Sequence, residues 1–127
     1  MAYQIQTLSR FISKSKGLAD VPFALVKGTP VTPREALAML QRGEAVQEIS
    51  YAISSLGAYS PQKDWLLAED YYSRLIRIPY PPPKIYRFEY ETTFEEALTH
   101  IRYRDAEGQK LVRTYQRLLR EMARRMR

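Results

Sequence analysis

Residues 109–127 constrain the fold more than any other part of this 127-residue sequence. Their apolar side chains recur at intervals of three and four residues, which is the spacing of one face of an α-helix. These side chains are Leu111, Tyr115, Leu118, Leu119, Met122 and Met126. An amphipathic helix is stabilised mainly by packing of its apolar face. We therefore expect residues 1–108 to form a body against which this helix packs.

The opposite side of the predicted terminal helix carries a row of basic side chains. These are Lys110, Arg113, Arg117, Arg120, Arg124 and Arg127, with Arg125 beside the row. A guanidinium stays charged at any pH and binds phosphate oxygens through paired N–H groups, so the row favours nucleic acid. Protein docking, membrane docking and a solvated face are the alternatives. The apolar side lacks Trp and Phe, which disfavours a membrane surface.

The net charge of +6 is concentrated at the ends of the chain. Residues 109–127 hold seven basic side chains and one acidic side chain, whereas residues 1–108 hold 13 of each kind. At the other end, Arg10, Lys14 and Lys16 all precede the first acidic residue. Such asymmetry indicates a polyanionic partner. These three N-terminal residues are therefore further candidates for phosphate contact.

Helix-start signals and apolar spacing predict an all-α fold. The segment Thr32-Pro33-Arg34-Glu35 combines a capping box with a proline at the first helical position, and Gly43 would end that helix. Ser60-Pro61 and Thr93-Phe94-Glu95-Glu96 mark two more helix starts. Apolar spacing adds helices over residues 3–16 and 46–56, while residues 18–31 read as an extended connection. With the terminal helix, this gives about five to six helices in a compact helical bundle.

A proline run divides the chain, which we expect to form a single helical domain over residues 1–127. Pro79-Tyr80-Pro81-Pro82-Pro83 must be extended, and the alternating residues 86–91 predict a short strand. Residues 79–92 then form an extended linker between the N-terminal helices of residues 1–78 and a helical hairpin or long helix over residues 93–127. The strand could pair with residues 21–27, or it could lie as an arm on a neighbouring subunit.

The composition argues against an enzyme. The chain has no Cys and one His, and it contains no Gly-rich phosphate loop. We expect His100 to make a structural hydrogen bond with Glu96, four residues earlier on the same helix. The sequence thus predicts no catalytic residues, no metal, no cofactor and no small-molecule substrate. No apolar run is long enough to cross a membrane, and no secretory leader opens the chain.

Residues 32–76 resemble a helix-turn-helix DNA-binding unit. In the stretch AVQEISYAISSLGAYSPQKDWL, a first helix would be followed by a turn at Leu56-Gly57 and by a recognition helix from Pro61. The resemblance implies a transcriptional regulator. Asp64, Glu69 and Asp70 lie on the would-be recognition helix, and acidic residues disfavour entry into a groove lined by phosphates. Two packed helices with a glycine cap are the preferred interpretation.

The size, helical body, basic ends, proline linker and richness in Tyr and Arg resemble the coat proteins of filamentous viruses of hyperthermophilic archaea. The absence of Asn and Cys also agrees with life at high temperature. The resemblance implies a capsid subunit in the virion that coats linear double-stranded DNA through its phosphates, without reading sequence. Its partners would be copies of itself or a paralogous coat subunit in a helical assembly. A cytoplasmic, nucleoid-associated protein is the alternative location.

Overall fold

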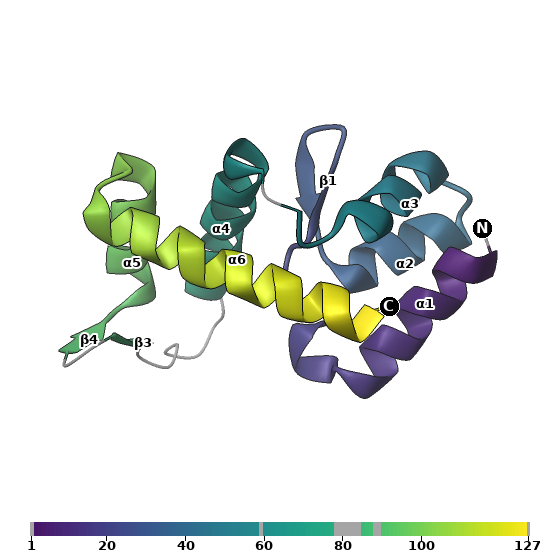
Figure 1. Cartoon of the computed structure of the whole chain (residues 1–127), viewed down its shortest axis with the longest axis horizontal. Coiled ribbons are helices and arrows are strands. Elements are labelled where there is room, and N and C mark those ends of the chain that lie inside the picture. The colour runs from purple at the N-terminus through teal and green to yellow at the C-terminus, as the bar shows by residue number, and fades with distance from the viewer. Residues whose placement is uncertain (1, 59, 78–84, 88–89, 127) are drawn as a thin grey trace.

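A computed structural model describes residues 2–58, 60–77, 85–87 and 90–126. Six α-helices and two β-hairpins make up these residues (Figure 1), which confirms the predicted helical class. The helices are α1 (Ala2–Lys14), α2 (Pro33–Gln41), α3 (Val46–Ser55), α4 (Pro61–Ile76), α5 (Phe94–Tyr103) and α6 (Ala106–Met126). A 3-10 turn, η1 (Lys16–Leu18), follows α1.

Short-range side-chain caps begin α2 and α5, as the sequence predicts. Thr32 accepts a hydrogen bond from the Glu35 amide (3.2 Å), and the Glu35 carboxylate accepts one from the Thr32 amide (2.9 Å). At α5, the Thr93 hydroxyl accepts from the amide of Glu96 (3.1 Å). Each cap satisfies backbone donors that the first helical turn leaves unpaired.

The connection before α2 contains a hairpin that the sequence analysis did not predict. Strand β1 (Ala24–Val26) pairs antiparallel with β2 (Thr29–Val31), and Ala24 lies opposite Val31. Lys27 and Gly28 form the turn with φ of +52° and +79°. Two consecutive positive φ values match the hairpin turn whose twist suits antiparallel strands.

The alternating segment near residue 90 is a second hairpin and not a single strand. Strand β3 (Ile85–Arg87) pairs antiparallel with β4 (Tyr90–Thr92). The predicted partner, residues 21–27, instead contributes β1 to the first hairpin. A local antiparallel pair closes only a short loop, so it forms at a lower entropic cost than a pairing across 60 or so residues. Residues 78–84 and 88–89, which include the proline run, lie outside the described residues.

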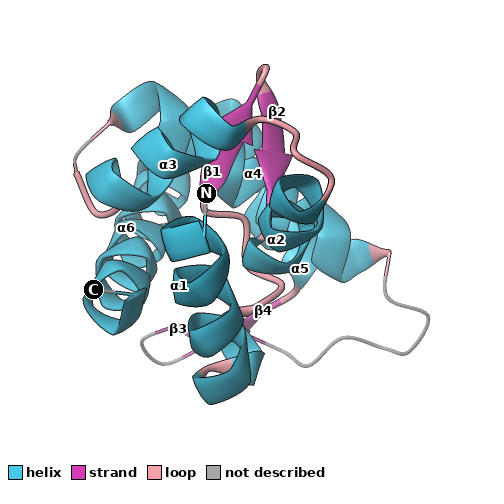
Figure 2. Ribbon diagram, turned by 90° about the vertical axis from the view of Figure 1, so that its right-hand side faces the viewer, coloured by secondary structure: helices cyan, strands magenta, loops and turns pink. Residues whose placement is uncertain are grey.

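Helix α6 lies along one side of the molecule and joins two groups of helices (Figure 1). Its N-terminal half packs on α4 and α5, and its C-terminal end meets α1. Helices α2 and α3 pack with α1, and the β1–β2 hairpin contacts both α3 and α4 (Figure 2). The buried core includes Phe11, Phe23, Ile49, Leu67 and Met122. These residues come from α1, the start of the hairpin, α3, α4 and α6, so a single core runs through both groups.

The corner between α5 and α6 explains why α6 begins earlier than predicted. Arg104 adopts a left-handed conformation (φ +54°), and the Asp105 carboxylate then accepts a hydrogen bond from the Gly108 amide (2.8 Å). This cap starts α6 at Ala106, about one turn before the predicted start near Gln109. Gly108 therefore lies inside the helix and does not break it. A Cβ at this position would clash with the His100 carbonyl oxygen, so glycine allows the two helices to approach closely.

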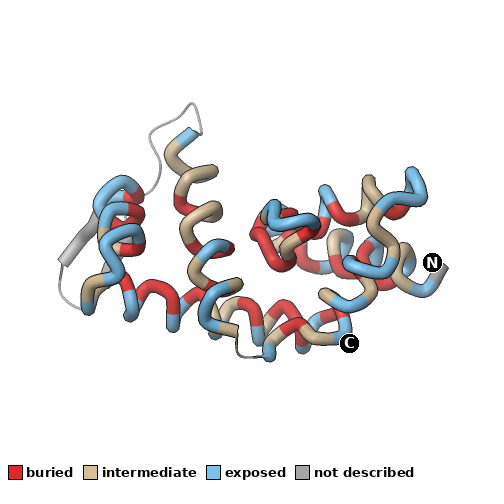
Figure 3. The backbone as a smooth tube through the Cα atoms, turned by 90° about the horizontal axis from the view of Figure 1, so that it is seen from above, coloured by how far each residue is buried: buried red, intermediate tan, exposed pale blue. Residues whose placement is uncertain are grey.

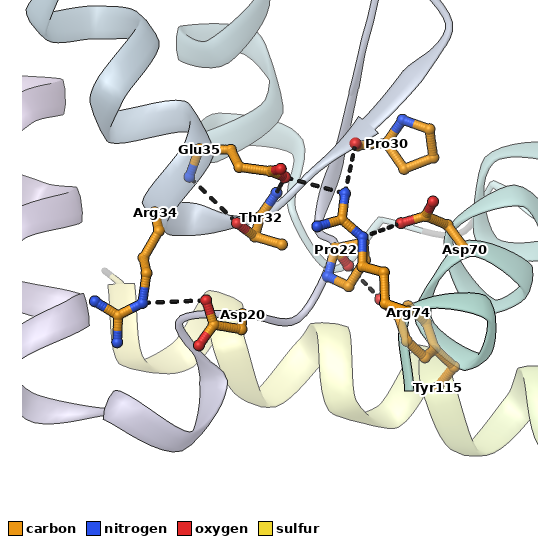
Figure 4. A network of polar contacts seen from close by, with 9 residues as sticks. All are labelled: Asp20, Pro22, Pro30, Thr32, Arg34, Glu35, Asp70, Arg74 and Tyr115. Carbon is orange, nitrogen blue, oxygen red and sulfur yellow. Dashed lines mark hydrogen bonds and ion pairs between the residues drawn. The ribbon is translucent and has the colours of Figure 1, made fainter. Parts of the chain in front are cut away.

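A polar network centred on Arg74 links α4 to the hairpin and to α2 (Figure 4). Its guanidinium donates to Asp70 (2.5 Å), to the Pro30 carbonyl (3.2 Å) and to Glu35 (3.0 Å). The Tyr115 hydroxyl donates to the Pro22 carbonyl and so attaches α6 to the segment that leads into the hairpin. Glu35 on α2 and Asp70 on α4 therefore help to hold these elements together through their contacts with Arg74.

Candidate nucleic-acid interface

Helix α6 has two faces of opposite chemistry. Its residues favour helix strongly, since Leu, Arg, Met, Glu, Gln and Lys make up most of it. Residues on one side are buried against the other helices, and buried and exposed stretches alternate along its length (Figure 3). At 100° per residue, Arg113, Arg117, Arg120 and Arg124 project close to opposite this buried face.

Every predicted contact residue that the structure describes is exposed. On α6 these are Lys110, Arg113, Arg117, Arg120, Arg124 and Arg125. Arg10 and Lys14 on α1 and Lys16 on η1 are exposed as well. Arg127 lies outside the described residues.

The centre of the basic row has no acidic partner. Among the described residues, no carboxylate lies within ion-pair distance of Arg113, Arg117 or Arg120. The ends of the row differ from its centre, because Lys110 lies 3.5 Å from Glu107 and Glu121 holds two arginines. The unpaired centre is therefore the part of the row that is most available to an anionic ligand.

Glu121 neutralises part of the C-terminal end of the row. Its carboxylate accepts hydrogen bonds from Arg124 and from Arg125, the latter at 2.8 Å. These hydrogen bonds, of which the one from Arg124 contributes most, lower the pKa of the Glu121 carboxyl to about 2. Glu121 therefore stays ionised at any ordinary pH, and a phosphate would have to compete with it for both arginines.

The fold brings the N-terminal basic residues to the C-terminal end of α6. The Arg10 guanidinium lies 3.5 Å from the Met126 carbonyl oxygen, where it can hydrogen-bond to the end of the helix. Arg125 donates to the Ser15 hydroxyl at 3.3 Å. A cation at a helix C-terminus also complements the negative end of the helix dipole. Arg10 thus has a structural role, while Lys14 and Lys16 extend the basic surface beyond α6.

A hollow follows one side of the row. It measures about 490 Å³ and is lined by the end of α3 and the turn after it, by Ala123, and by Arg120 and Arg124. Gly57, with φ +92°, is one of its lining residues, and a Cβ there would lie 3.3 Å from the Cβ of Ala123. The glycine therefore lets the turn approach the side of α6, next to the basic row.

A second hollow beside α6 contains residues that the sequence analysis did not single out. It measures about 350 Å³, and its lining includes Trp65, Arg104 and Arg113. The Arg104 guanidinium lies 5.0 Å from the centre of the Trp65 ring, within the range of a cation–π contact. Because 39 positions separate these two residues, no spacing pattern in the sequence could have indicated the pair.

No protein-family model, curated protein or solved structure matches this chain. In the described part of the chain, no helix has the length and hydropathy needed to cross a bilayer. Within the same residues, His, Cys, Asp and Glu side chains do not come together in a group that could hold a metal ion. The basic row on α6 and the hollows beside it are the features on which a function can be based.

The arrangement of α3 and α4 does not favour the helix-turn-helix alternative. In such a unit the two helices pack against each other across a short turn. Here α3 packs on α1, α2 and β1, whereas α4 packs on α5, α6 and the hairpin, and β1 lies between α3 and α4 (Figure 1). Asp64 is buried and accepts a hydrogen bond from Gln116 (2.9 Å), and Glu69 pairs with Arg102 (3.2 Å). Asp64 therefore stabilises the fold, and Glu69 adds negative charge to the exposed surface of α4, so α4 is a poor candidate for a recognition helix.

His100 has a structural hydrogen bond, but with a different partner from the predicted one. Its Nδ1 atom lies 2.6 Å from a carboxylate oxygen of Asp105. The same Asp105 caps α6, so its two oxygens hold the last turn of α5 and the first turn of α6 together. Helical spacing predicts Glu96, four residues earlier, because it indicates only partners within one helix.

Proposed function

We propose that this protein packages double-stranded DNA by binding its phosphates without reading sequence. The observation that carries the proposal is the exposed, unpaired set Arg113, Arg117 and Arg120, opposite the buried face of α6. Exposed arginines on ordinary helices are commonly paired with acids at i+3 or i+4. An unpaired row has no such stabilisation and concentrates positive potential along one line, which favours a linear polyanion.

The spacing of the row supports contact with a backbone. Arg113 and Arg124 lie roughly 16 Å apart along the helix, a length over which duplex DNA carries roughly ten charges. Four arginines neutralise fewer than half of these charges. One subunit therefore binds weakly, and a useful packaging protein needs many copies side by side on the DNA.

Assembly is the second part of the proposal. In it, copies of this chain, or this chain and a paralogous subunit, form a helical coat in a filamentous virion. The exposed Tyr3, Tyr51 and Tyr103 support the assembly, since tyrosine is enriched in protein interfaces. A nucleoid-associated protein in the cytoplasm would use the same phosphate contacts without a regular coat.

Charge neutralisation on α6 tests the DNA contact. We expect the triple variant Arg113→Gln, Arg117→Gln, Arg120→Gln to bind duplex DNA of the order of 100-fold more weakly at low salt. The slope of log affinity against log salt concentration should also fall in magnitude by about 2.7, since three phosphate contacts are lost. The control is Lys27→Gln, Arg42→Gln, Arg77→Gln, which removes the same charge from the β1–β2 turn and the ends of α2 and α4. Equal affinity of the two variants would refute the assignment of the row.

Electron microscopy tests the assembly. Purified protein mixed with long linear duplex DNA should form continuous, uniform filaments on DNA of any sequence, and should form none without DNA. The triple α6 variant should form none under the same conditions. Discrete complexes at sparse sites would contradict packaging. They would instead favour a sequence-specific regulator that binds DNA through residues 32–76.

A further inference from the structure

The hollow beside the N-terminal half of α6 combines an aromatic ring with cations and amides. Trp65 comes from α4, Arg104 from the corner after α5, and Arg113 with two glutamines from α6. Its volume of about 350 Å³ lies within the range of pockets that bind small organic groups. A pocket of this composition, open to solvent, suits a flat, polar ring that carries a phosphate.

The guanidinium of Arg104 covers the Trp65 ring and can move away from it. Arg104 is exposed, and its guanidinium contacts the ring at 5.0 Å. Among the described residues, no carboxylate pairs with Arg104. A guanidinium held only by a ring face can move to a phosphate at small cost, because an exposed cation–π contact is weak. The ring would then be free to stack.

The pocket is continuous with the basic row. Arg113 both lines the pocket and belongs to the row, so a ligand in the pocket would lie beside the path of the bound backbone. The Gln116 amide is held by a hydrogen bond from its nitrogen to Asp64 (2.9 Å), and Gln109 lines the same pocket. Side-chain amides offer both donors and acceptors, which suits the edge of a nucleobase.

We infer that this pocket binds one unpaired nucleobase of a nucleic acid strand, stacked on Trp65, with its phosphate between Arg104 and Arg113. The inference rests on the proposed contact between α6 and DNA and adds a second mode to it. Fully paired DNA would use only the phosphate contacts of the row. A single-stranded segment, a gap or a frayed end would also place a base in the pocket. Stacking on an aromatic ring tolerates any base, which agrees with binding that ignores sequence.

Trp65 is the single tryptophan of the chain, so its fluorescence reports directly on the pocket. The experiment titrates the full chain with three ligands of about 12 nucleotides: an oligothymidylate, an abasic strand of equal length, and a blunt duplex. Binding is followed by fluorescence anisotropy of a dye on each ligand, and stacking by quenching of Trp65 emission. We expect the oligothymidylate to quench, whereas the abasic strand and the duplex should bind with little quenching.

Variants of Trp65 complete the test. Trp65→Leu should lower affinity for the oligothymidylate roughly tenfold and leave duplex affinity unchanged, since only an unpaired base stacks on the ring. Trp65→Phe keeps an aromatic face and should recover part of the loss. Circular dichroism establishes that both variants are folded.

Two results would overturn the base pocket and leave the proposed function standing: oligothymidylate that binds without quenching, or Trp65→Leu that binds it as tightly as the original chain. Failure of the proposed function gives a different pattern. In that case the blunt duplex does not bind the original chain, whatever happens at Trp65.

Discussion

At the scale of single residues, glycine and buried or partly buried polar groups decide the local geometry. Gly108 contacts the backbone of α5, and Glu35 is held by the Thr32 amide and by Arg74. The Thr32 contact is part of the predicted capping box. The close approach of Gly108 to α5 and the pairing of Glu35 with Arg74 do not follow from residue type, because each depends on what the fold places opposite.

Replacing Gly108 by alanine should destabilise the protein by about 1–3 kcal/mol, because the new Cβ meets the His100 carbonyl oxygen. Alanine favours a helix over glycine by about 1 kcal/mol, so the clash has to exceed this gain. Urea denaturation measures the difference. The control is Gly17→Ala, where a Cβ meets no atom within 4 Å, and its stability should stay the same or rise. A stabilised Gly108→Ala variant would show that α5 and α6 are less closely packed.

Because of Glu35, the free energy of unfolding should depend on pH in the acidic range. Burial opposes its ionisation, but the hydrogen bond from the Thr32 amide and the contacts with Arg74 outweigh burial and lower its pKa below the ordinary 4.5. A carboxyl with a lowered pKa stabilises the fold above its unfolded pKa, and this contribution disappears as pH falls through the folded value. Glu35→Gln should therefore be less stable than the original chain at pH 7, and the gap in urea midpoint should narrow below about pH 4.5. A gap that is constant with pH would contradict this.

At the scale of elements, capping and the faces of helices explain where each helix begins and what it contacts. Thr32 and Thr93 were predictable caps, since a capping box occupies four consecutive residues. Asp105 was missed as a cap because the terminal helix was predicted to begin only at residue 109. The chain instead turns at Arg104, whose positive φ is uncommon outside glycine.

Removing the Asp105 cap should weaken α6 and its junction with α5. We expect Asp105→Ala to lose about 1 kcal/mol or more, since one carboxylate oxygen caps the Gly108 amide and the other contacts His100. Asp105→Ser can still cap the helix but cannot reach His100 in the same way, so it should recover part of the loss. Asp20→Ala is the control, because Asp20 makes an exposed ion pair with Arg34, a kind of pair that contributes little. Thermal denaturation ranks the three variants.

At the scale of the whole molecule, α6 serves two roles with its two faces. The buried face joins α4 and α5 to α1 and the core. The opposite face exposes Arg113, Arg117 and Arg120, which have no acidic partner among the described residues. The hydroxyl of Tyr115 reaches the Pro22 carbonyl from α6, across 93 positions of the chain. Burial raises the pKa of Tyr115 well above its ordinary value, so this hydroxyl keeps its proton and remains a donor.

Tyr115→Phe should destabilise the whole fold by about 1–3 kcal/mol, because a buried carbonyl loses its partner. Tyr103→Phe is the matched control, since Tyr103 is 76% exposed, and it should change stability by less than about 0.5 kcal/mol. Denaturant titration followed by both near- and far-ultraviolet circular dichroism measures the two variants. Equal stability of the two would mean that water satisfies the Pro22 carbonyl.

Residue spacing along the chain was enough to predict the helical class, the caps of α2 and α5 and the two chemically different faces of α6. Each of these depends on residues three or four positions apart, so the interaction is present in the sequence as spacing. The same reasoning identified Arg113, Arg117 and Arg120 as one exposed row.

Residue spacing did not indicate which of these cations are unpaired, that Arg10 meets the end of α6, or that Trp65 and Arg104 share a pocket; these follow from the packing of the helices. It also paired β1 with β2 and β3 with β4, where the alternating pattern indicated a strand but not its partner. Contacts between distant positions depend on how the core packs and on loop closure, and no local spacing encodes them.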